Sequence, residues 1–191
     1  MAAEGKEGWG KMKKNVWFII YLLIGSAISH QTAQADNIKT YRDQALGFEV
    51  SYLENWEQAR SPSNPAFFLK RKSVQEPGTI SFHVAGFTGN KDLFLNEIRS
   101  NPQKFIEKYK QRFPSAEMIE NGDTYLGGFP AYFITTGYEL KNLNFEMEIV
   151  AIQIFCIKEK TIYLINFETP LLLFEKTFNE FQTILATFNF R

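Results

Sequence analysis

Three long stretches rich in Ile, Phe, Tyr and Thr follow one another with almost nothing between them. They cover residues 130–140, 144–158 and 161–168, and the links include Lys141-Asn142 and Glu159-Lys160. Aromatic and β-branched residues favour strands. Parallel strands need a crossover of a dozen or more residues, so links this short join antiparallel neighbours. The sequence therefore commits this part of the chain to an antiparallel sheet.

Two of these stretches are apolar on both sides. The middle stretch changes phase, with one set of alternating apolar residues followed by another: Phe145, Met147 and Ile149, then Val150, Ile152 and Ile154. A phase change predicts either a β-bulge or a strand that is covered on both faces. Residues 162–167 are apolar on both parities except Asn166, which predicts a central strand.

Earlier segments predict further strands and turns. Residues 46–52 alternate between apolar and polar side chains, and shorter apolar runs cover 67–72 and 80–84. Asn121-Gly122 predicts a tight hairpin turn, and Gly127-Gly128 predicts a second bend.

Helical spacing appears in two places. Residues 91–113 carry apolar side chains four apart, interrupted by Asn101-Pro102, which predicts two helices or one kinked helix. Near the C-terminus, Thr169 is expected to cap a helix with Pro170 in its first turn. Its apolar stripe consists of Phe174, Phe178, Phe181, Leu185 and Phe188. Helices on both faces of a sheet predict an α+β fold, a three-layer α/β/α sandwich around a mostly antiparallel sheet.

The N-terminal segment has the layout of a secretory signal. Lys11, Lys13 and Lys14 precede an apolar run over 16–28, and Ala33-Gln34-Ala35 comes just before Asp36. We expect cleavage after Ala35, which leaves a single domain over 36–191 that is periplasmic or extracellular. A retained membrane anchor is the alternative. Met12 is a candidate for the true start, because a conventional signal begins there.

Composition excludes several classes of protein. The 21 basic residues balance the 21 acidic ones, which argues against a general nucleic-acid binder. One Cys cannot form an intramolecular disulfide or a multi-Cys metal site. An apolar fraction of 45% is typical of a globular chain rather than a disordered one.

The order of these elements, with several short motifs, resembles the PsbP-like family, whose fold is shared with a Ran-binding nuclear import factor. The motifs that carry the resemblance lie at 41–43 with 46–56, at 127–132, and at 163–167 with 188–190. The chain departs from the family at Leu53, where Pro is usual, and at Thr187, where Ser is usual. The resemblance implies an exported, non-enzymatic domain and names no catalytic residue.

The candidate catalytic residues also have structural explanations. His83 and Cys156 are a conceivable base and nucleophile, but His83 is predicted to face solvent and Cys156 lies in an apolar strand. Glu146 and Glu148 share a strand face about 6.6 Å apart, a spacing at which paired carboxylates can hydrolyse glycosides. They also fit the solvent-exposed side of an amphipathic strand. Three isolated acids sit at predicted turns or helix starts: Asp43, Asp92 and Asp123. We therefore expect no enzyme, no metal and no cofactor.

Binding is the function that the sequence favours. The candidate partner surface consists of Trp56, Arg60, Phe129, Lys70, Arg71 and Lys72. Trp56 is equally suited to the core, and the three basic residues equally suit a charged edge strand. Basic residues over 104–112 predict a solvated helix face. We expect a binding or assembly module acting on an envelope protein or complex, with only peripheral membrane contact or contact through an uncleaved signal. A carrier of a lipid or other hydrophobic molecule is the alternative, because aromatic residues can line a cavity, and a hydrolase is a weaker one.

Overall fold

The computed structural model describes residues 38–60, 67–72, 81–88, 91–141 and 146–191. All of them belong to the unit Asp36–Arg191, one of the two into which the chain divides. The residues of the expected signal and its cleavage site, Ala33, Ala35 and Asp36, lie outside the described residues, so cleavage stays a prediction.

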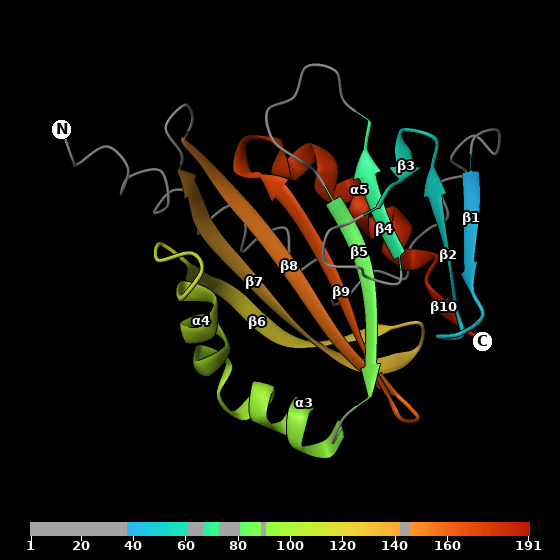
Figure 1. Ribbon diagram of the computed structural model, residues 1–191, viewed down its shortest axis with the longest axis horizontal. Helices are drawn as coiled ribbons and strands as arrows, with labels where there is room; N and C mark the ends of the chain where they lie inside the picture. The colour runs from blue at the N-terminus through green and yellow to red at the C-terminus, as the bar shows by residue number, and fades with distance from the viewer. Residues whose placement is uncertain (1–37, 61–66, 73–80, 89–90, 142–145) are drawn as a thin grey trace. The chain divides into compact units, whose positions relative to one another are not determined.

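Seven strands form the central sheet (Figure 1). In spatial order they are β3 (Trp56–Gln58), β4 (Phe67–Arg71), β5 (Ser81–Thr88), β9 (Thr161–Pro170), β8 (Glu146–Lys158), β7 (Phe129–Lys141) and β6 (Glu117–Leu126). Each neighbouring pair is antiparallel. The predicted antiparallel sheet is confirmed.

The strands β8 and β9 are buried on both faces along most of their length. β8 keeps an unbroken register with β7 from Glu146 to Cys156, and with β9 from Ile149 to Lys158. The phase change in the middle stretch therefore reflects two covered faces and not a bulge. β9 occupies the middle of the seven strands, as the apolar character of 162–167 predicts.

The hairpin turn between β6 and β7 lies at Gly127-Gly128 and not at Asn121-Gly122. Both turn glycines have positive φ, 54° and 83°, as a two-residue turn of the mirror-image type requires. Asn121 and Gly122 instead lie inside β6, paired with β7. Gly122 serves packing, because a Cβ there would lie 3.2 Å from the ring of Phe133 on the facing strand. The prediction of a turn at Asn121-Gly122 was wrong because side-chain packing, not turn chemistry, selects this glycine.

Two helices cover one face of the sheet over β6, β7 and β8. They are α3 (Lys91–Ser100) and α4 (Pro102–Lys110), separated by Asn101, whose side chain accepts a hydrogen bond from the Lys104 backbone N–H at 3.2 Å. Of the two alternatives, two helices is therefore right. Their apolar residues pack on the sheet in a cluster that includes Leu95, Ile98, Ile106, Tyr132, Ile134 and Phe155.

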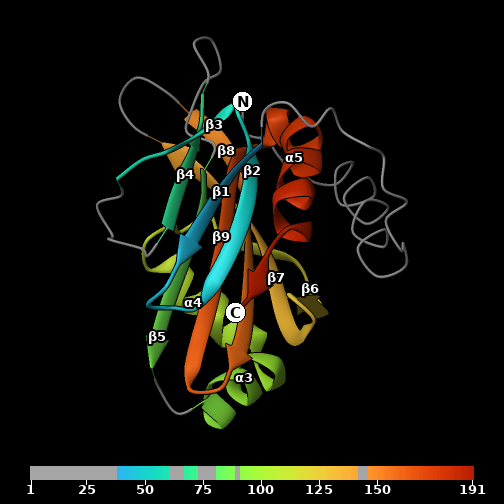
Figure 2. The same cartoon turned by 90° about the vertical axis from the view of Figure 1, so that its right-hand side faces the viewer.

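The opposite face carries a helix and a small second sheet (Figure 2). The helix α5 (Phe174–Ala186) follows a 3-10 turn, η2 (Leu171–Leu173). The predicted start at Thr169-Pro170 is four residues early, because β9 pairs with β8 as far as Pro170. Thr169 is buried at the strand end, and its hydroxyl lies 3.0 Å from that of Thr177.

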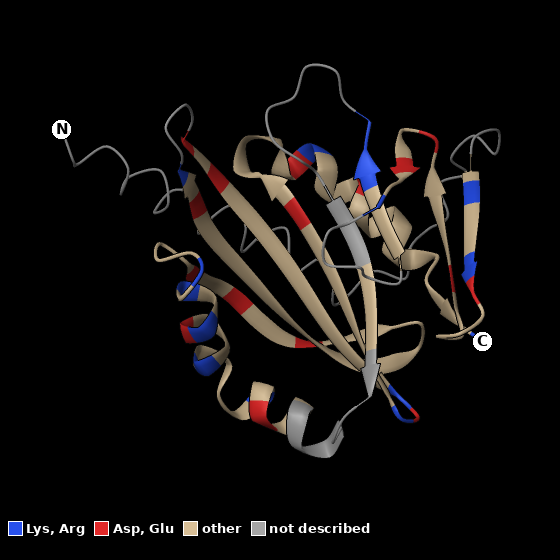
Figure 3. Cartoon of the chain, in the orientation of Figure 1, with Lys and Arg blue, Asp and Glu red and all other residues tan. Residues whose placement is uncertain are grey.

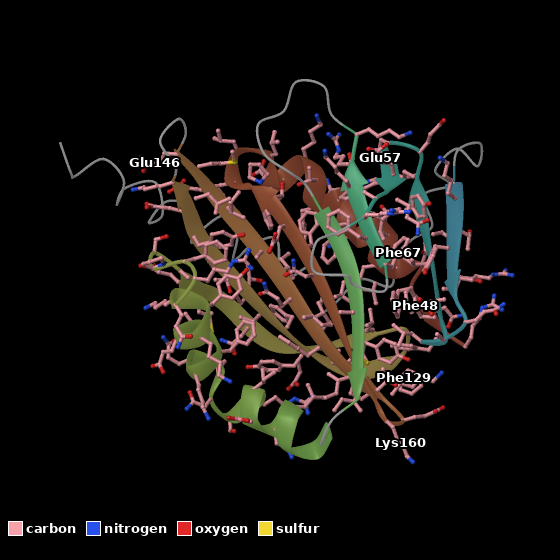
Figure 4. All side chains as sticks on the ribbon, viewed as in Figure 1. Phe48, Glu57, Phe67, Phe129, Glu146 and Lys160 are labelled. Carbon is pink, nitrogen blue, oxygen red and sulfur yellow. The ribbon has the colours of Figure 1, made fainter. Side chains whose placement is uncertain are left out.

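The small sheet has the order β1-β2-β10 and consists of β1 (Ile38–Asp43), β2 (Phe48–Leu53) and β10 (Asn189–Phe190). It packs on the large sheet through aromatic rings. Phe48 stacks on Phe188 with centroids 5.3 Å apart and meets Phe67 of β4 edge-on (Figure 4). The predicted three-layer sandwich is confirmed, with this sheet sharing the third layer with α5.

Candidate functional site

An aromatic and basic surface lies at one end of the large sheet. The β6–β7 turn, the β8–β9 turn and the C-terminal strand β10 come together there, and Figure 4 shows Phe129 and Lys160 at this end. We call it the hairpin-end surface and define it by Tyr125, Phe129, Lys158, Lys160 and Phe190. Tyr125 pairs with Pro130 and Leu126 with Phe129, so Tyr125 and Phe129 lie on opposite faces of the β6–β7 hairpin. Tyr125 is 71% exposed and Phe129 37%, which sets them apart from the buried rings of the core.

Phe129 is held in place by its neighbours. The Lys158 ammonium lies 5.9 Å from the centre of the Phe129 ring and 5.5 Å from that of Phe190. The two rings meet edge-on with centroids 5.3 Å apart. Lys158 Nζ also donates a hydrogen bond to the Arg191 carbonyl at 2.7 Å. Each cation–ring contact at an exposed position contributes about 0.5–1 kcal/mol, so the partly exposed ring is ordered before it meets anything.

The C-terminal residues are anchored beneath this surface. The Arg191 backbone N–H donates to the Gly47 carbonyl at 2.9 Å. The Arg191 guanidinium pairs with Glu49, which also pairs with Arg42. These partners, Arg42 first, lower the pKa of the Glu49 carboxyl. The end of β10 therefore stays fixed to the β1–β2 hairpin.

Trp56 and Arg71, expected at a partner surface, belong to an internal junction. Trp56 is 0% exposed, and its indole Nε1 donates to Glu180 Oε2 of α5 at 3.0 Å. Arg71 donates to the same carboxylate, with Nε 3.0 Å from Oε2 and a terminal nitrogen 3.1 Å from Oε1. Neither side chain is presented to a partner, so their placement at a partner surface is corrected. For Trp56, the alternative of a core residue holds.

The other predicted partner residues remain exposed but lie elsewhere. Arg60, Lys70 and Lys72 are exposed, and the basic end of β4 lies at the end of the sheet opposite the hairpin-end surface (Figure 3). Lys70 is directly opposite Glu57 of the short edge strand β3. This position suits a charged edge as well as an acidic partner. The structure therefore separates Phe129 from the basic cluster.

The base and nucleophile considered from the sequence are not neighbours. Cys156 is buried, and its pKa is raised to about 11 by burial. His83, whose side chain lies outside the described residues, pairs with Asn166 of β9, whereas Cys156 pairs with Tyr163. β9 separates their strands, and the odd offset places the two positions on opposite faces of the sheet. The register therefore excludes this dyad.

The candidate acids have structural partners. Glu146 pairs with Lys141 at 2.8 Å, and Glu148 lies opposite Glu139, which also pairs with Lys141. Asp123 is exposed and pairs with Arg99 at 3.0 Å. Asp43 Oδ1 accepts a hydrogen bond from the Leu46 backbone N–H at 2.9 Å, as expected of an Asp in a turn. The side chain of Asp92, at the start of α3, lies outside the described residues.

The basic residues of α4 lie on its exposed side, and Lys104 pairs with Glu97 of α3. Within the described ranges, no group of three or more His, Cys, Asp or Glu residues is arranged to hold a metal ion. No helix in the same ranges is long and apolar enough to cross a membrane.

Sequence reasoning identified Phe129 but missed Tyr125, Lys158, Lys160 and Phe190. The available signal was the Gly127-Gly128 turn, since two aromatic residues flank it and a turn exposes its neighbours. Lys158 and Phe190 carry no such local signal, because only the pairing of distant strands brings them to Phe129.

Comparison with solved structures identifies the architecture. The solution structure of cyanobacterial PsbP (CyanoP) from Synechocystis sp. PCC 6803 matches with a TM-score of 0.59 and 16% identity, over 88% of this chain and 99% of that one. The fold is that of PsbP. The same PsbP-like fold relates the chain to LpqN of Mycobacterium tuberculosis, with a TM-score of 0.54, 11% identity, and 80% and 90% of the two chains covered.

A Pseudomonas aeruginosa protein of unknown function, PA94, matches with a TM-score of 0.52 and 12% identity, over 79% of this chain and 95% of that one. No protein-family model and no curated protein sequence matches the chain. At these identities the likeness extends to the fold alone.

Proposed function

We propose that this protein is an exported, non-catalytic binding module that acts on a protein or complex of the cell envelope. The observation that carries the proposal is the hairpin-end surface, where Lys158 and Phe190 hold the partly exposed Phe129 in place. Aromatic anchors surrounded by polar groups are typical of protein interfaces. A ring that is already ordered loses little side-chain entropy on binding.

The make-up of this surface favours recognition over catalysis. Its defining members are aromatic rings and amines, with the exposed Glu159 between the two lysines. The buried thiol of Cys156 is held protonated at neutral pH by its raised pKa. A nucleophile needs an adjacent base or a lowered pKa. We therefore assign no catalytic residue.

The cell-envelope location rests on two further supports. The N-terminal segment has the layout of a secretion signal, with Ala33-Gln34-Ala35 before Asp36. The structurally similar LpqN is described as involved in cell envelope biogenesis. An exported domain of this fold therefore has envelope proteins as its natural partners.

The test is a crosslinking pull-down of the tagged protein from its native envelope, with mass spectrometry of the captured proteins and lipids. Phe129→Ala should reduce capture of a reproducible protein partner about tenfold or more. A tenfold loss of affinity corresponds to about 1.4 kcal/mol of binding free energy, which an aromatic interface anchor can contribute. Leu172→Ala removes an apolar side chain that is 92% exposed on η2, away from this surface, and should leave capture unchanged.

A second variant tests the basic end of β4. If Lys70→Glu with Lys72→Glu abolishes capture while Phe129→Ala does not, the partner binds at that end and the hairpin-end surface is excluded. If lipid alone is captured, and equally by all variants, a lipid carrier replaces the binding module.

A further inference from the structure

Polar side chains lie where the central strands should be most apolar. Gln153 of β8 and Asn166 of β9 are only 3% and 4% exposed, directly opposite each other on the face that α4 covers. Glu168 lies two residues beyond Asn166 on the same face. Burying an amide without a partner costs about 1–3 kcal/mol. A group of such residues in the sheet centre therefore needs an explanation.

Some of these polar groups form hydrogen bonds with each other. Gln153 Nε2 donates to Asn166 Oδ1 at 2.8 Å. The Tyr109 side chain of α4 lies beside Gln153 and beside Tyr138 of β7. Burial, and next the nearby Glu168 carboxylate, raise the pKa of both tyrosines, so both stay neutral at physiological pH. The bond to Asn166 uses the amide nitrogen of Gln153 and leaves its oxygen without a partner among the described residues.

The unused polar atoms surround one small residue, Ala151. Gln153 Oε1 and Thr136 Oγ1 are buried and have no hydrogen-bond partner among the described residues. Thr136 and Glu168 lie on either side of Ala151 in the sheet, and Gln153 lies two residues along the same strand. In the part of the chain that the structure describes, Glu168 forms no ion pair. Each of the three groups around Ala151 can accept a hydrogen bond, and one of them is a carboxylate.

Aromatic rings complete the surroundings of Ala151. Tyr109 and Phe113 pack against the cluster that contains Ala151 and Tyr138. The ring centroids of Tyr109 and Tyr138 are 5.7 Å apart, and those of Phe113 and Tyr138 are 4.2 Å apart. The Arg112 guanidinium lies 5.1 Å from the centre of the Phe113 ring, so the outer side of this aromatic group already accommodates a cation.

We propose that the residues around Ala151, namely Thr136, Gln153 and Glu168 with the rings of Tyr109 and Tyr138, bind the ammonium group of a small amine. An ammonium has three N–H donors and no acceptor, which matches three acceptor groups. The carboxylate favours a cation over a neutral donor, and aromatic faces attract cations. This site lies on another part of the sheet from the hairpin-end surface, and the inference does not depend on the proposed partner.

The test separates charge from hydrogen-bond donation by titrating the purified full chain with three probes. Butylammonium has charge and donors, butyltrimethylammonium has charge without donors, and butanol has a donor without charge. We expect butylammonium alone to shift the side-chain amide NMR signals of Gln153 and Asn166 in a saturable way, with the other two binding at least tenfold more weakly.

Glu168→Gln should weaken butylammonium binding about tenfold or more, since a hydrogen bond to a charged group contributes about 1.5–3 kcal/mol. Glu175→Gln, at an exposed position on α5, is the matched control and should change nothing. If Glu168→Gln does not fold, Thr136→Val keeps the shape of the side chain and should still weaken binding. Absence of a saturable shift, equal binding of all three probes, or an equal loss in the control would overturn the proposal.

Discussion

At the scale of a single residue, burial decides what Cys156 can do. The thiol is fully enclosed, with Sγ 3.6 Å from the Pro130 carbonyl oxygen, and burial raises its pKa from 9.0 to about 11. The folded state therefore favours the protonated thiol. The thiol of the unfolded chain has a pKa of 9.0, so this contribution to stability is complete below pH 9. It is lost as the pH rises through 11, the pKa of the folded state.

Labelling with iodoacetamide at pH 8 tests this prediction. The native protein should react very slowly, because only the thiolate attacks and access requires opening of the sheet. The same chain in denaturant should react completely and supplies the control. Rapid labelling of the native protein would show that the thiol is exposed or ionised.

At the scale of the element, Glu180 joins α5 to the edge strand β3 and its neighbour β4. Its carboxylate accepts hydrogen bonds from both Trp56 and Arg71, whose charged group is largely buried. Glu180→Gln should lower the free energy of unfolding by about 2–3 kcal/mol, because the Arg71 guanidinium loses its counter-charge. Denaturant unfolding followed by tryptophan fluorescence measures it. Glu175→Gln, exposed on the same helix, should cost less than about 0.5 kcal/mol; equal losses would contradict the role of the junction.

The turn between β6 and β7 allows a comparison of adjacent glycines. Both have positive φ, but a Cβ on Gly127 would lie 2.8 Å from the Phe190 ring, whereas one on Gly128 would have nothing within 4 Å. Gly128→Ala should cost about 1–2 kcal/mol from backbone strain alone. Gly127→Ala should lower the free energy of unfolding further, because it also displaces the Phe190 ring. Thermal unfolding measures the loss of stability, and partner capture measures the effect on the hairpin-end surface. Equal costs would mean that the Phe190 ring moves freely.

The elements that the sequence predicted correctly are those with a local pattern. The strands β7, β8 and β9 and the break at Asn101-Pro102 follow from composition and short links, which act within a few residues. The errors arose where distant contacts override local signals. Gly122 resembles a turn residue but lies under the Phe133 ring, and Pro170 resembles a helix start but pairs with Ile149. β1 was missed because most of its side chains are exposed and carry no apolar alternation.

At the scale of the whole molecule, both candidate sites depend on strand order, which the sequence does not display. Phe129, Lys158 and Phe190 come from three separate segments and meet because β7, β8 and the end of β10 reach the same end of the fold. The residues around Ala151 likewise come together only through the register of β7, β8 and β9. Gln153 and its neighbour Asn166 carry a local signal, since each is the polar exception in an apolar run.

The N-terminal segment predicts how the protein is processed during export. In a secreting bacterium we expect removal of the N-terminal segment after Ala35, because small residues at positions 33 and 35 match the cleavage pattern. Intact mass of the exported protein should then correspond to residues 36–191. Ala35→Phe replaces the small residue that the pattern requires and should leave the longer form attached to the membrane. Gln34→Ala, between the two small residues, should be processed normally. A wild-type protein that keeps its N-terminal segment and fractionates with the membrane would instead establish a retained anchor, and the binding module would act while tethered there.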